Sequence, residues 1–265
     1  MLAVLGLVVM HAADIEELGQ ILPRAKPVWL LAALAWQVTT YVSVALGWKM
    51  VVSEAGHPQP LSRLIPIALS KMFADVAVPI AGMSGNLLLV ARLRTLGIPR
   101  ATAIAALLVS IVGLYAVYTL FAVLMLLFLW LHGNATPLAV GLISAFLFVS
   151  LAIPSFALWL RKRGCLSRPS ILNRLPFAQA FMKMVAEAPV ALVGSERLVA
   201  KVAAMNGLVL LADAATMQVC FRAIGIEIPY STGFLAVMAG LIGTTLGPIP
   251  LGMGSMRRAQ RRCLP

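Results

Sequence analysis

The stretch from Leu64 to Arg94 is apolar enough to enter a lipid bilayer, yet it differs from an ordinary membrane-spanning helix. Its middle contains helix-breaking and small polar residues: Pro79, Gly82, Ser84, Gly85 and Asn86. Two charged residues, Lys71 and Asp75, precede this interruption, and charges at membrane depth are candidate functional sites. Lipid cannot pair the backbone groups that a broken helix exposes, so such backbone requires surrounding protein or a water-filled cavity. We therefore expect a broken element with a functional role.

A second stretch, Phe234 to Met256, has a similar layout. In both copies an apolar half-helix leads through a small polar patch to a proline and a glycine-rich segment. PIAGMSG at residues 79–85 corresponds to PLGMGSM at residues 250–256, which contains Pro250, Gly252 and Gly254. Paired segments interrupted by glycine and proline are typical of a transporter binding site. The alternative is that both residues are simply frequent in membrane helices.

The composition, 61% apolar and 11% charged, is typical of a membrane protein with several spans. In such a protein the net charge of +12 indicates basic cytoplasmic loops beside anionic lipid, and we expect no nucleic-acid partner. The three cysteines and three histidines are scattered without metal-binding or redox spacing. We therefore expect no metal, no disulfide and no cofactor.

Long apolar runs predict the membrane spans, since a span needs about 20 apolar residues. These runs cover residues 28–48, 101–131, 137–160 and 202–221, with Asp213 inside the last. Trp29 and Trp48 suit the aromatic belt at the membrane interface. The apolar run at residues 2–10 is short for a span, and we interpret it as the tail of a first helix that begins outside this chain.

Lysine and arginine concentrate in cytoplasmic loops, so their distribution predicts the topology. The loop from Arg161 to Lys183 is predicted to be cytoplasmic, the turn at residues 132–137 external, and the turn from Arg92 to Arg100 cytoplasmic. The basic loop with Lys49 and Arg63 is also predicted to be cytoplasmic, although Arg24 and Lys26 then lie outside. A stretch with both flanks on one side cannot cross the membrane, so Leu64–Arg94 is expected to enter, turn and return.

The second copy starts on the outside, after Glu227, so it is upside down relative to the first. The predicted fold is all-α: one polytopic transmembrane helical bundle with two re-entrant broken helices in an inverted repeat. Its first repeat covers about residues 28–131 and its second about residues 137–256, followed by an atypical tail at residues 257–265.

Lys71 and Asp75 are four residues apart and share one helix face. They either line a path for a lipid phosphate or coupling ion, or form an ion pair that makes burial tolerable. Arg92 and Arg94 either hold a lipid phosphate or act as ordinary cytoplasmic anchors.

Asp213 has no charged neighbour on its own helix, so it is expected to be neutral or bonded to another helix. A proton-coupling role and packing against Lys71 are both open. Ser84, Asn86, Thr244 and Thr245 either line the same cavity or bond between helices.

The order of these motifs resembles a known family. It runs from an apolar half-helix through Pro79-x-x-Gly82 and Arg92 to Leu96-Gly97-Ile98-Pro99, and later to Pro250-x-Gly252-x-Gly254. This resembles the flippase-like, lysylphosphatidylglycerol-synthase transmembrane family of bacterial and archaeal proteins. The tail after Met256 departs from that pattern, which normally continues to an acidic residue and further helices, and we interpret the chain as truncated there.

The resemblance implies a multi-pass inner-membrane protein that translocates a lipid or lipid-linked head group. Its partners would be membrane lipids, either an anionic phospholipid or a lipid-linked sugar. The alternatives are a lipid-binding or regulatory subunit without transport, and the membrane part of an aminoacyl-phospholipid synthase system. We expect no enzymatic activity, because the sequence has no Ser/His/Asp or Cys/His arrangement and no soluble synthase domain.

Overall fold

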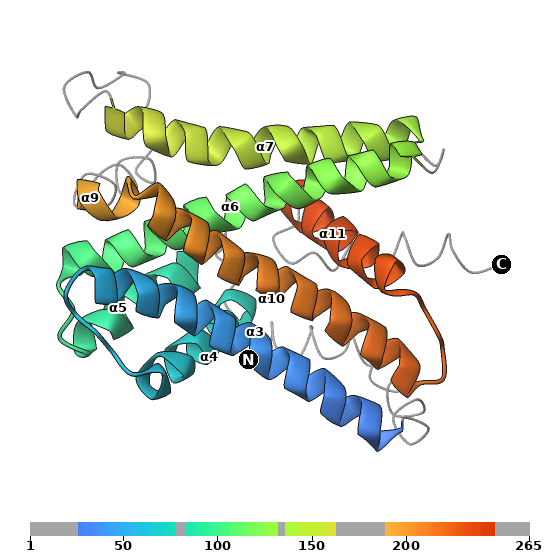
Figure 1. Cartoon of the computed structure of the whole chain (residues 1–265), viewed down its shortest axis with the longest axis horizontal. Coiled ribbons are helices and arrows are strands. Elements are labelled where there is room, and N and C mark those ends of the chain that lie inside the picture. The colour runs from blue at the N-terminus through green and yellow to red at the C-terminus, as the bar shows by residue number, and fades with distance from the viewer. Residues whose placement is uncertain (1–25, 78–82, 132–135, 163–188, 247–265) are drawn as a thin grey trace, which may run out of the picture.

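The computed structural model describes residues 26–77, 83–131, 136–162 and 189–246, and these residues form helices joined by short connections. Figure 1 shows their arrangement as a bundle. The helices are α3 (Pro27–Glu54), α4 (Leu61–Ala77), α5 (Met83–Thr95), α6 (Arg100–Leu131), α7 (Pro137–Lys162), α9 (Val190–Val193), α10 (Glu196–Ala223) and α11 (Tyr230–Leu246). Within the described residues no strand occurs, which confirms the predicted all-α class.

Three helices, α3, α6 and α10, are long and apolar enough to cross a membrane. They have 28, 32 and 28 residues, more than the roughly 20 that a bilayer core requires. They contain the predicted spans at 28–48, 101–131 and 202–221, and α7 contains the one predicted at 137–160. These four span predictions are therefore confirmed as helices.

Local chemistry explains several of the helix boundaries. Pro27 opens α3, where its fixed φ fits the first turn and its missing N–H costs no hydrogen bond. The Ser195 hydroxyl accepts a hydrogen bond from the Leu198 N–H at the start of α10. Gly97 and Gly225, just beyond α5 and α10, have φ values of +80° and +86°, a conformation that favours glycine.

The stretch predicted to be broken forms two separate helices, α4 and α5, which pack side by side as a hairpin. The hairpin starts and finishes at the end of the bundle where α3 ends and α6 and α10 begin, on the left in Figure 1. With 17 and 13 residues, the two arms are about 26 and 20 Å long, shorter than the three spans.

The helix α11 starts at the opposite end of the bundle. A hydrogen bond from the Lys26 N–H to the Ala223 carbonyl oxygen, 3.0 Å long, joins the start of α3 to the end of α10 at that end. From there α11 runs back along the bundle, and Met238 and Ile242 pack against Ala122 of α6. The hairpin and α11 thus approach the middle of the bundle from opposite ends (Figure 1).

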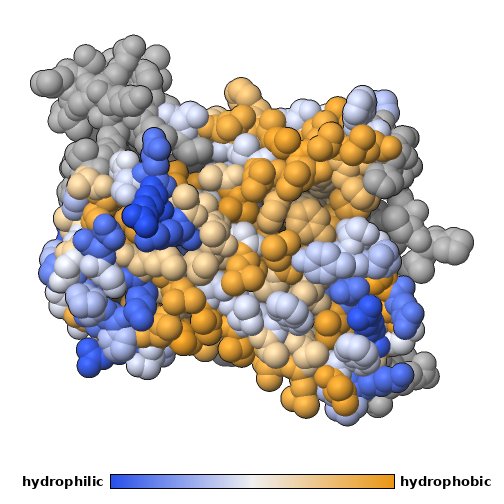
Figure 2. Space-filling model, viewed as in Figure 1, coloured by the Kyte–Doolittle hydropathy of each residue, from blue (hydrophilic) through white to orange (hydrophobic). Residues whose placement is uncertain are grey.

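The two ends differ in charge. We call the left end in Figure 1 the basic end, and it carries these charged residues on described segments: Lys49, Glu54, Arg63, Arg92, Arg94, Arg100, Arg161, Lys162, Glu196, Arg197 and Lys201. The opposite end carries Lys26, Arg222 and Glu227. Figure 2 shows hydrophilic residues gathered toward the two ends with apolar residues between them. This asymmetry follows the rule that places basic residues on the cytoplasmic side.

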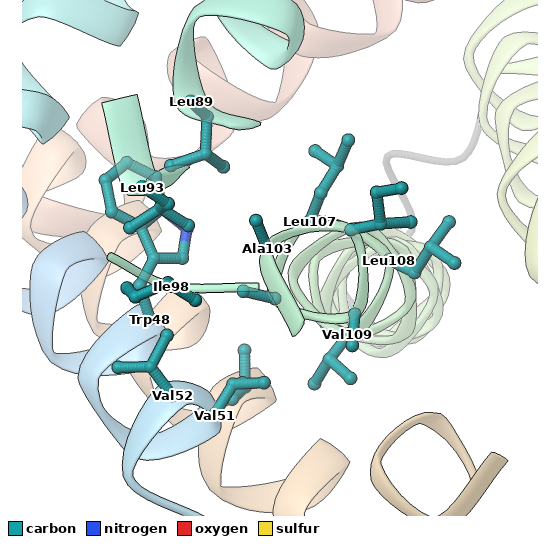
Figure 3. Close-up of a cluster of buried hydrophobic side chains, with 14 of the residues drawn as sticks. Trp48, Val51, Val52, Leu89, Leu93, Ile98, Ala103, Leu107, Leu108 and Val109 are labelled. Atoms are coloured by element: carbon teal, nitrogen blue, oxygen red, sulfur yellow. The ribbon is translucent and has the colours of Figure 1, made fainter. Parts of the chain in front are cut away.

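The larger apolar core lies toward the basic end, where α3, α4, α5, α6 and α10 meet (Figure 3). It contains Trp48, which is only 2% exposed and packs among buried aliphatic side chains such as Leu93 and Ile104. The prediction that Trp48 belongs to the aromatic belt at the membrane interface is therefore wrong, because its ring is buried among other helices of the bundle. A smaller core joins α6, α7 and α11 around Ala122 and Phe146.

Candidate functional site

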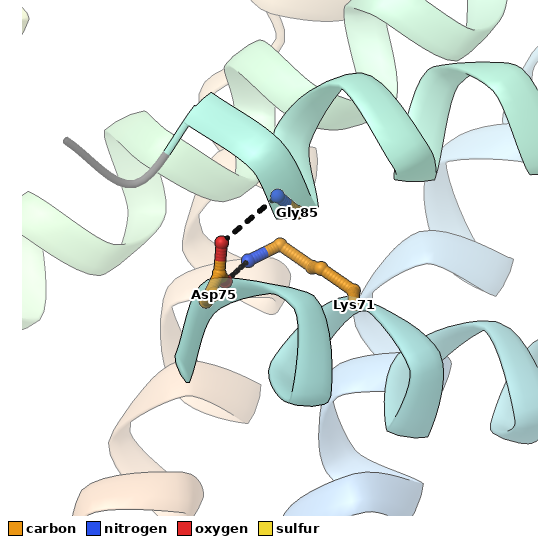
Figure 4. Close-up of polar contacts among 3 residues, drawn as sticks. All are labelled: Lys71, Asp75 and Gly85. Carbon is orange, nitrogen blue, oxygen red and sulfur yellow. Dashed lines mark hydrogen bonds and ion pairs between the residues drawn. The ribbon is translucent and has the colours of Figure 1, made fainter. Parts of the chain in front are cut away.

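A group of polar contacts around Asp75 joins the two arms of the α4–α5 hairpin (Figure 4). The Lys71 Nζ donates to Asp75 Oδ2 at 2.6 Å, and the Gly85 N–H donates to Asp75 Oδ1 at 3.1 Å. Each carboxylate oxygen of Asp75 thus has a donor of its own. The structure brings together three of the residues that the sequence singled out.

The spacing of these residues on their helices explains the contact. Lys71 and Asp75 lie one turn apart on α4, so their side chains share one face. Gly85 is the third residue of α5, where a helix leaves its first N–H groups without intrahelical partners. A carboxylate is favoured at such a terminus by hydrogen bonding and by the helix dipole. Asp75 therefore caps α5 from the neighbouring helix.

Gly85 is the residue type that this contact requires. A Cβ atom built on Gly85 would overlap the Asp75 carboxylate, lying 2.6 Å from its Cγ and 2.8 Å from its Oδ2. Any other residue would force the carboxylate away from the Gly85 N–H. The small residue predicted for the interruption thus allows a charged side chain to approach the backbone closely.

The Lys71 and Asp75 side chains are 22% and 28% exposed, so the pair is not sealed inside protein. The Lys71 ammonium has three N–H donors, whereas the ion pair with Asp75 requires one. The arrangement can therefore present positive charge to an anion while its own carboxylate remains paired.

A second polar contact ties α3 to α10. The Thr40 hydroxyl, which is buried, lies 3.2 Å from Asp213 Oδ1 and donates to it, and lies 3.4 Å from the Trp36 carbonyl oxygen. The expectation that Asp213 bonds to another helix is confirmed, and its partner is Thr40, whereas Lys71 pairs with Asp75. Sequence reasoning missed Thr40, although two adjacent threonines in an apolar helix were the available signal.

Of the other predicted residues, the three whose side chains the structure describes, Arg92, Arg94 and Asn86, take no part in these two contacts. Arg92 and Arg94 lie exposed in the last turn of α5, at the basic end, as the anchoring interpretation expects. Asn86 is half-buried beside Gly85 on α5. Three more residues belong to terminal turns of described helices: Ser84 in α5, and Thr244 and Thr245 in α11. The predicted positions outside the described residues are Pro79, Gly82, Pro250, Gly252 and Gly254.

Comparison with known proteins adds one finding. A family described as the lysylphosphatidylglycerol synthase TM region matches residues 1–257 of the chain. This range covers every described helix and all the predicted site residues. No curated protein and no solved structure matched the chain.

Proposed function

Since the chain belongs to the lysylphosphatidylglycerol synthase TM region family, we propose that this membrane protein translocates a lipid or lipid-linked head group across the inner membrane. The observation that carries the proposal is the contact among Lys71, Asp75 and Gly85 at the closed end of the α4–α5 hairpin. A membrane protein places ionisable residues among apolar helices at a cost, and such residues commonly mark a substrate path.

In this proposal the α4–α5 hairpin is re-entrant, entering from the cytoplasmic side and returning to it. Asp75 lies 14 residues from the start of α4, which places it about 21 Å along the helix from the basic end. α11 then enters from the opposite side as the counterpart of α4 in an inverted repeat, and its supporting observation is its start beside the Lys26 end of the bundle. Both elements would flank a substrate site near the middle of the bilayer.

We propose an anionic head group, a phosphate-bearing phospholipid or lipid-linked sugar, as the substrate. The basic residues around the hairpin's open end would attract such a head group from the cytoplasmic leaflet. Lys71 would then meet its phosphate as a charge-assisted donor. No catalytic step belongs to this proposal.

The second candidate is a lipid-binding or regulatory subunit that does not transport. It is favoured by the same contact, because Asp75 already has both a cation and an N–H as partners. If the pair only compensates for burial, replacing both charges by apolar residues removes a desolvation cost and leaves function intact.

The two candidates are separated by a transport assay in reconstituted vesicles that carry fluorescent phosphatidylglycerol. We expect the parent protein to move labelled lipid between leaflets, and the double variant Lys71→Met, Asp75→Leu to fold but lose this movement. Lys26→Met, at an exposed position at the end of the bundle opposite the basic end, is the matched control and should retain transport. Full transport by the double variant would reject the phosphate role of Lys71, and no transport by the parent would reject translocation of this lipid.

A further inference from the structure

A groove with apolar walls lies between α6 and α11, away from the α4–α5 hairpin. We call it the α6–α11 groove, and its volume is about 170 Å³. The residues that line it are Leu124, Met125, Phe128, Ser231, Phe234 and Leu235. The Phe121 and Phe234 rings meet edge to face at one side of it, with centroids 5.2 Å apart and planes at 84°. This aromatic pair thus joins α6 to α11 beside the groove.

The position of the groove along the bundle indicates which part of the membrane it faces. Leu124 lies seven residues before the end of α6, about 10 Å from that end, and Ser231 is the second residue of α11. The groove therefore lies toward the end of the bundle opposite the basic end. α6 is long and apolar enough to span a membrane, and in that position the groove would open within the leaflet on that side.

The polarity of the groove matches a lipid lying parallel to the helices. Its walls are apolar, while the hydroxyl-bearing Ser231 stands at the start of α11. Beyond Ser231, the connection to α10 carries Glu227, and Arg222 lies in the last turn of α10. An acyl chain suits the walls, and a head group suits the charged and polar residues at the bundle end.

We propose that the α6–α11 groove holds one acyl chain of a phospholipid from the leaflet opposite the basic end. The head group of this lipid lies at the α10–α11 connection. Contacts with the groove's side chains retain the chain, because packing in a membrane rests on van der Waals contact rather than on the hydrophobic effect. This site lies toward the start of α11, whereas the substrate site proposed above lies near the middle of the bilayer, so the two sites take up different parts of the helix.

Photolabelling of the full chain in phospholipid vesicles tests this site. The probe is phosphatidylcholine with a diazirine at the middle of one acyl chain, and labelled residues are mapped by mass spectrometry. We expect labelling per residue at Leu124 and Leu235 to exceed that at Leu31 and Leu34 of α3 about fivefold. That ratio corresponds to a difference of about 1 kcal/mol in the free energy of lipid binding. Leu31 and Leu34 lie near the same end of the bundle and are 67% and 60% exposed, against 46% for Leu124. Labelling that follows exposure alone would overturn the proposal.

A pair of variants provides the second measurement. Leu124→Trp fills the groove, whereas Leu127→Trp adds the same side chain at a position that is equally exposed, 48% against 46%, but does not line it. We expect the first variant to reduce labelling of Leu235 about fivefold and the second to leave it unchanged. Equal labelling in both variants, or a crosslink from a Ser231→Cys variant to a second copy of the chain, would overturn the proposal. Lipid transport is not the readout, so either result leaves the translocation proposal standing.

Discussion

Two carboxylates lie among the apolar helices, and each has a donor from a different helix. Asp75 of α4 accepts from the α5 backbone, and Asp213 of α10 accepts from Thr40 of α3. A carboxylate without partners in such surroundings would carry a large desolvation penalty. These contacts therefore join α4 to α5 and α10 to α3.

The first prediction concerns Gly85→Ala. The new methyl group would overlap the Asp75 carboxylate, so the capping hydrogen bond should be lost at a cost of about 1–3 kcal/mol. Gly141→Ala is the control, because a Cβ atom at Gly141 meets nothing within 4 Å, and alanine there should be neutral or stabilising by up to about 1 kcal/mol. The measurement is thermal unfolding in detergent micelles. Equal Tm values for both variants would contradict this account of Gly85.

The second prediction concerns Thr40→Val, which keeps the shape of the side chain but removes the donor to Asp213. We expect the free energy of unfolding to fall by about 1–3 kcal/mol, because the half-buried carboxylate loses its hydrogen bond. Thr39→Val is the matched control, since the Thr39 hydroxyl bonds within its own helix, to the Ala35 carbonyl oxygen at 3.0 Å. Denaturation in detergent should show the difference. A Thr39 variant that loses as much stability as the Thr40 variant would contradict the role of Thr40 in joining α3 to α10.

Small residues set the distance between neighbouring helices. A Cβ atom at Gly113 of α6 would lie 3.1 Å from the Ala203 backbone nitrogen and 3.2 Å from Asn206 Nδ2. Asn206 in turn donates to the Ser110 carbonyl oxygen at 3.4 Å. Close approach of this kind at glycine, with a polar side chain bonding across, is typical of helix pairs in membranes. The α6–α10 interface thus depends on a missing side chain.

The third prediction follows from this interface. Gly113→Ala should push α6 away from α10 and lower the free energy of unfolding by about 1–3 kcal/mol. The atom nearest to the new methyl group is the Ala203 backbone nitrogen, which cannot rotate away as a side chain could. Gly207→Ala, on the facing helix, places its Cβ atom 3.9 Å from the Val117 Cγ1, an ordinary contact, and should be tolerated. The two variants are compared by unfolding in detergent and by the yield of correctly folded protein. A neutral Gly113→Ala would show that the interface can widen freely.

At the scale of the whole molecule, the charge asymmetry and the arrangement of helix ends agree. The ends of α3 and α5 and the starts of α6 and α10 share the basic end, while the α10–α11 connection lies opposite (Figure 1). The rule for basic residues predicts that the basic end faces the cytoplasm. A hairpin with both ends on that side would be re-entrant, as proposed above.

The fourth prediction tests this arrangement with single cysteines in a variant whose three native cysteines are serine. Ser53→Cys before the hairpin and Thr95→Cys at its end should both react with an impermeant thiol reagent from the cytoplasmic face, and Glu227→Cys from the other face. All three positions are exposed, so failure to react on one face reflects the membrane. Reaction of Ser53→Cys and Thr95→Cys from opposite faces would mean that the hairpin crosses the bilayer.

The amino-acid sequence by itself determined the all-α class of this protein, its long apolar helices and one contact of its candidate site. Apolar runs predict α3, α6, α7 and α10 because hydropathy and length are local properties. The pairing of Lys71 with Asp75 was also predictable, since four residues on a helix are always one turn apart.

Only the tertiary structure decided which groups complete each contact. Gly85 lies ten residues from Asp75, and Thr40 lies 173 residues from Asp213, so no helical spacing relates them. Whether two such residues meet depends on how each helix is rotated about its axis and how closely it packs. The rotation of α3 also places Trp48 in the core rather than in the predicted aromatic belt at the membrane interface. Periodicity defines a face of one helix, and packing against the other helices determines what that face meets.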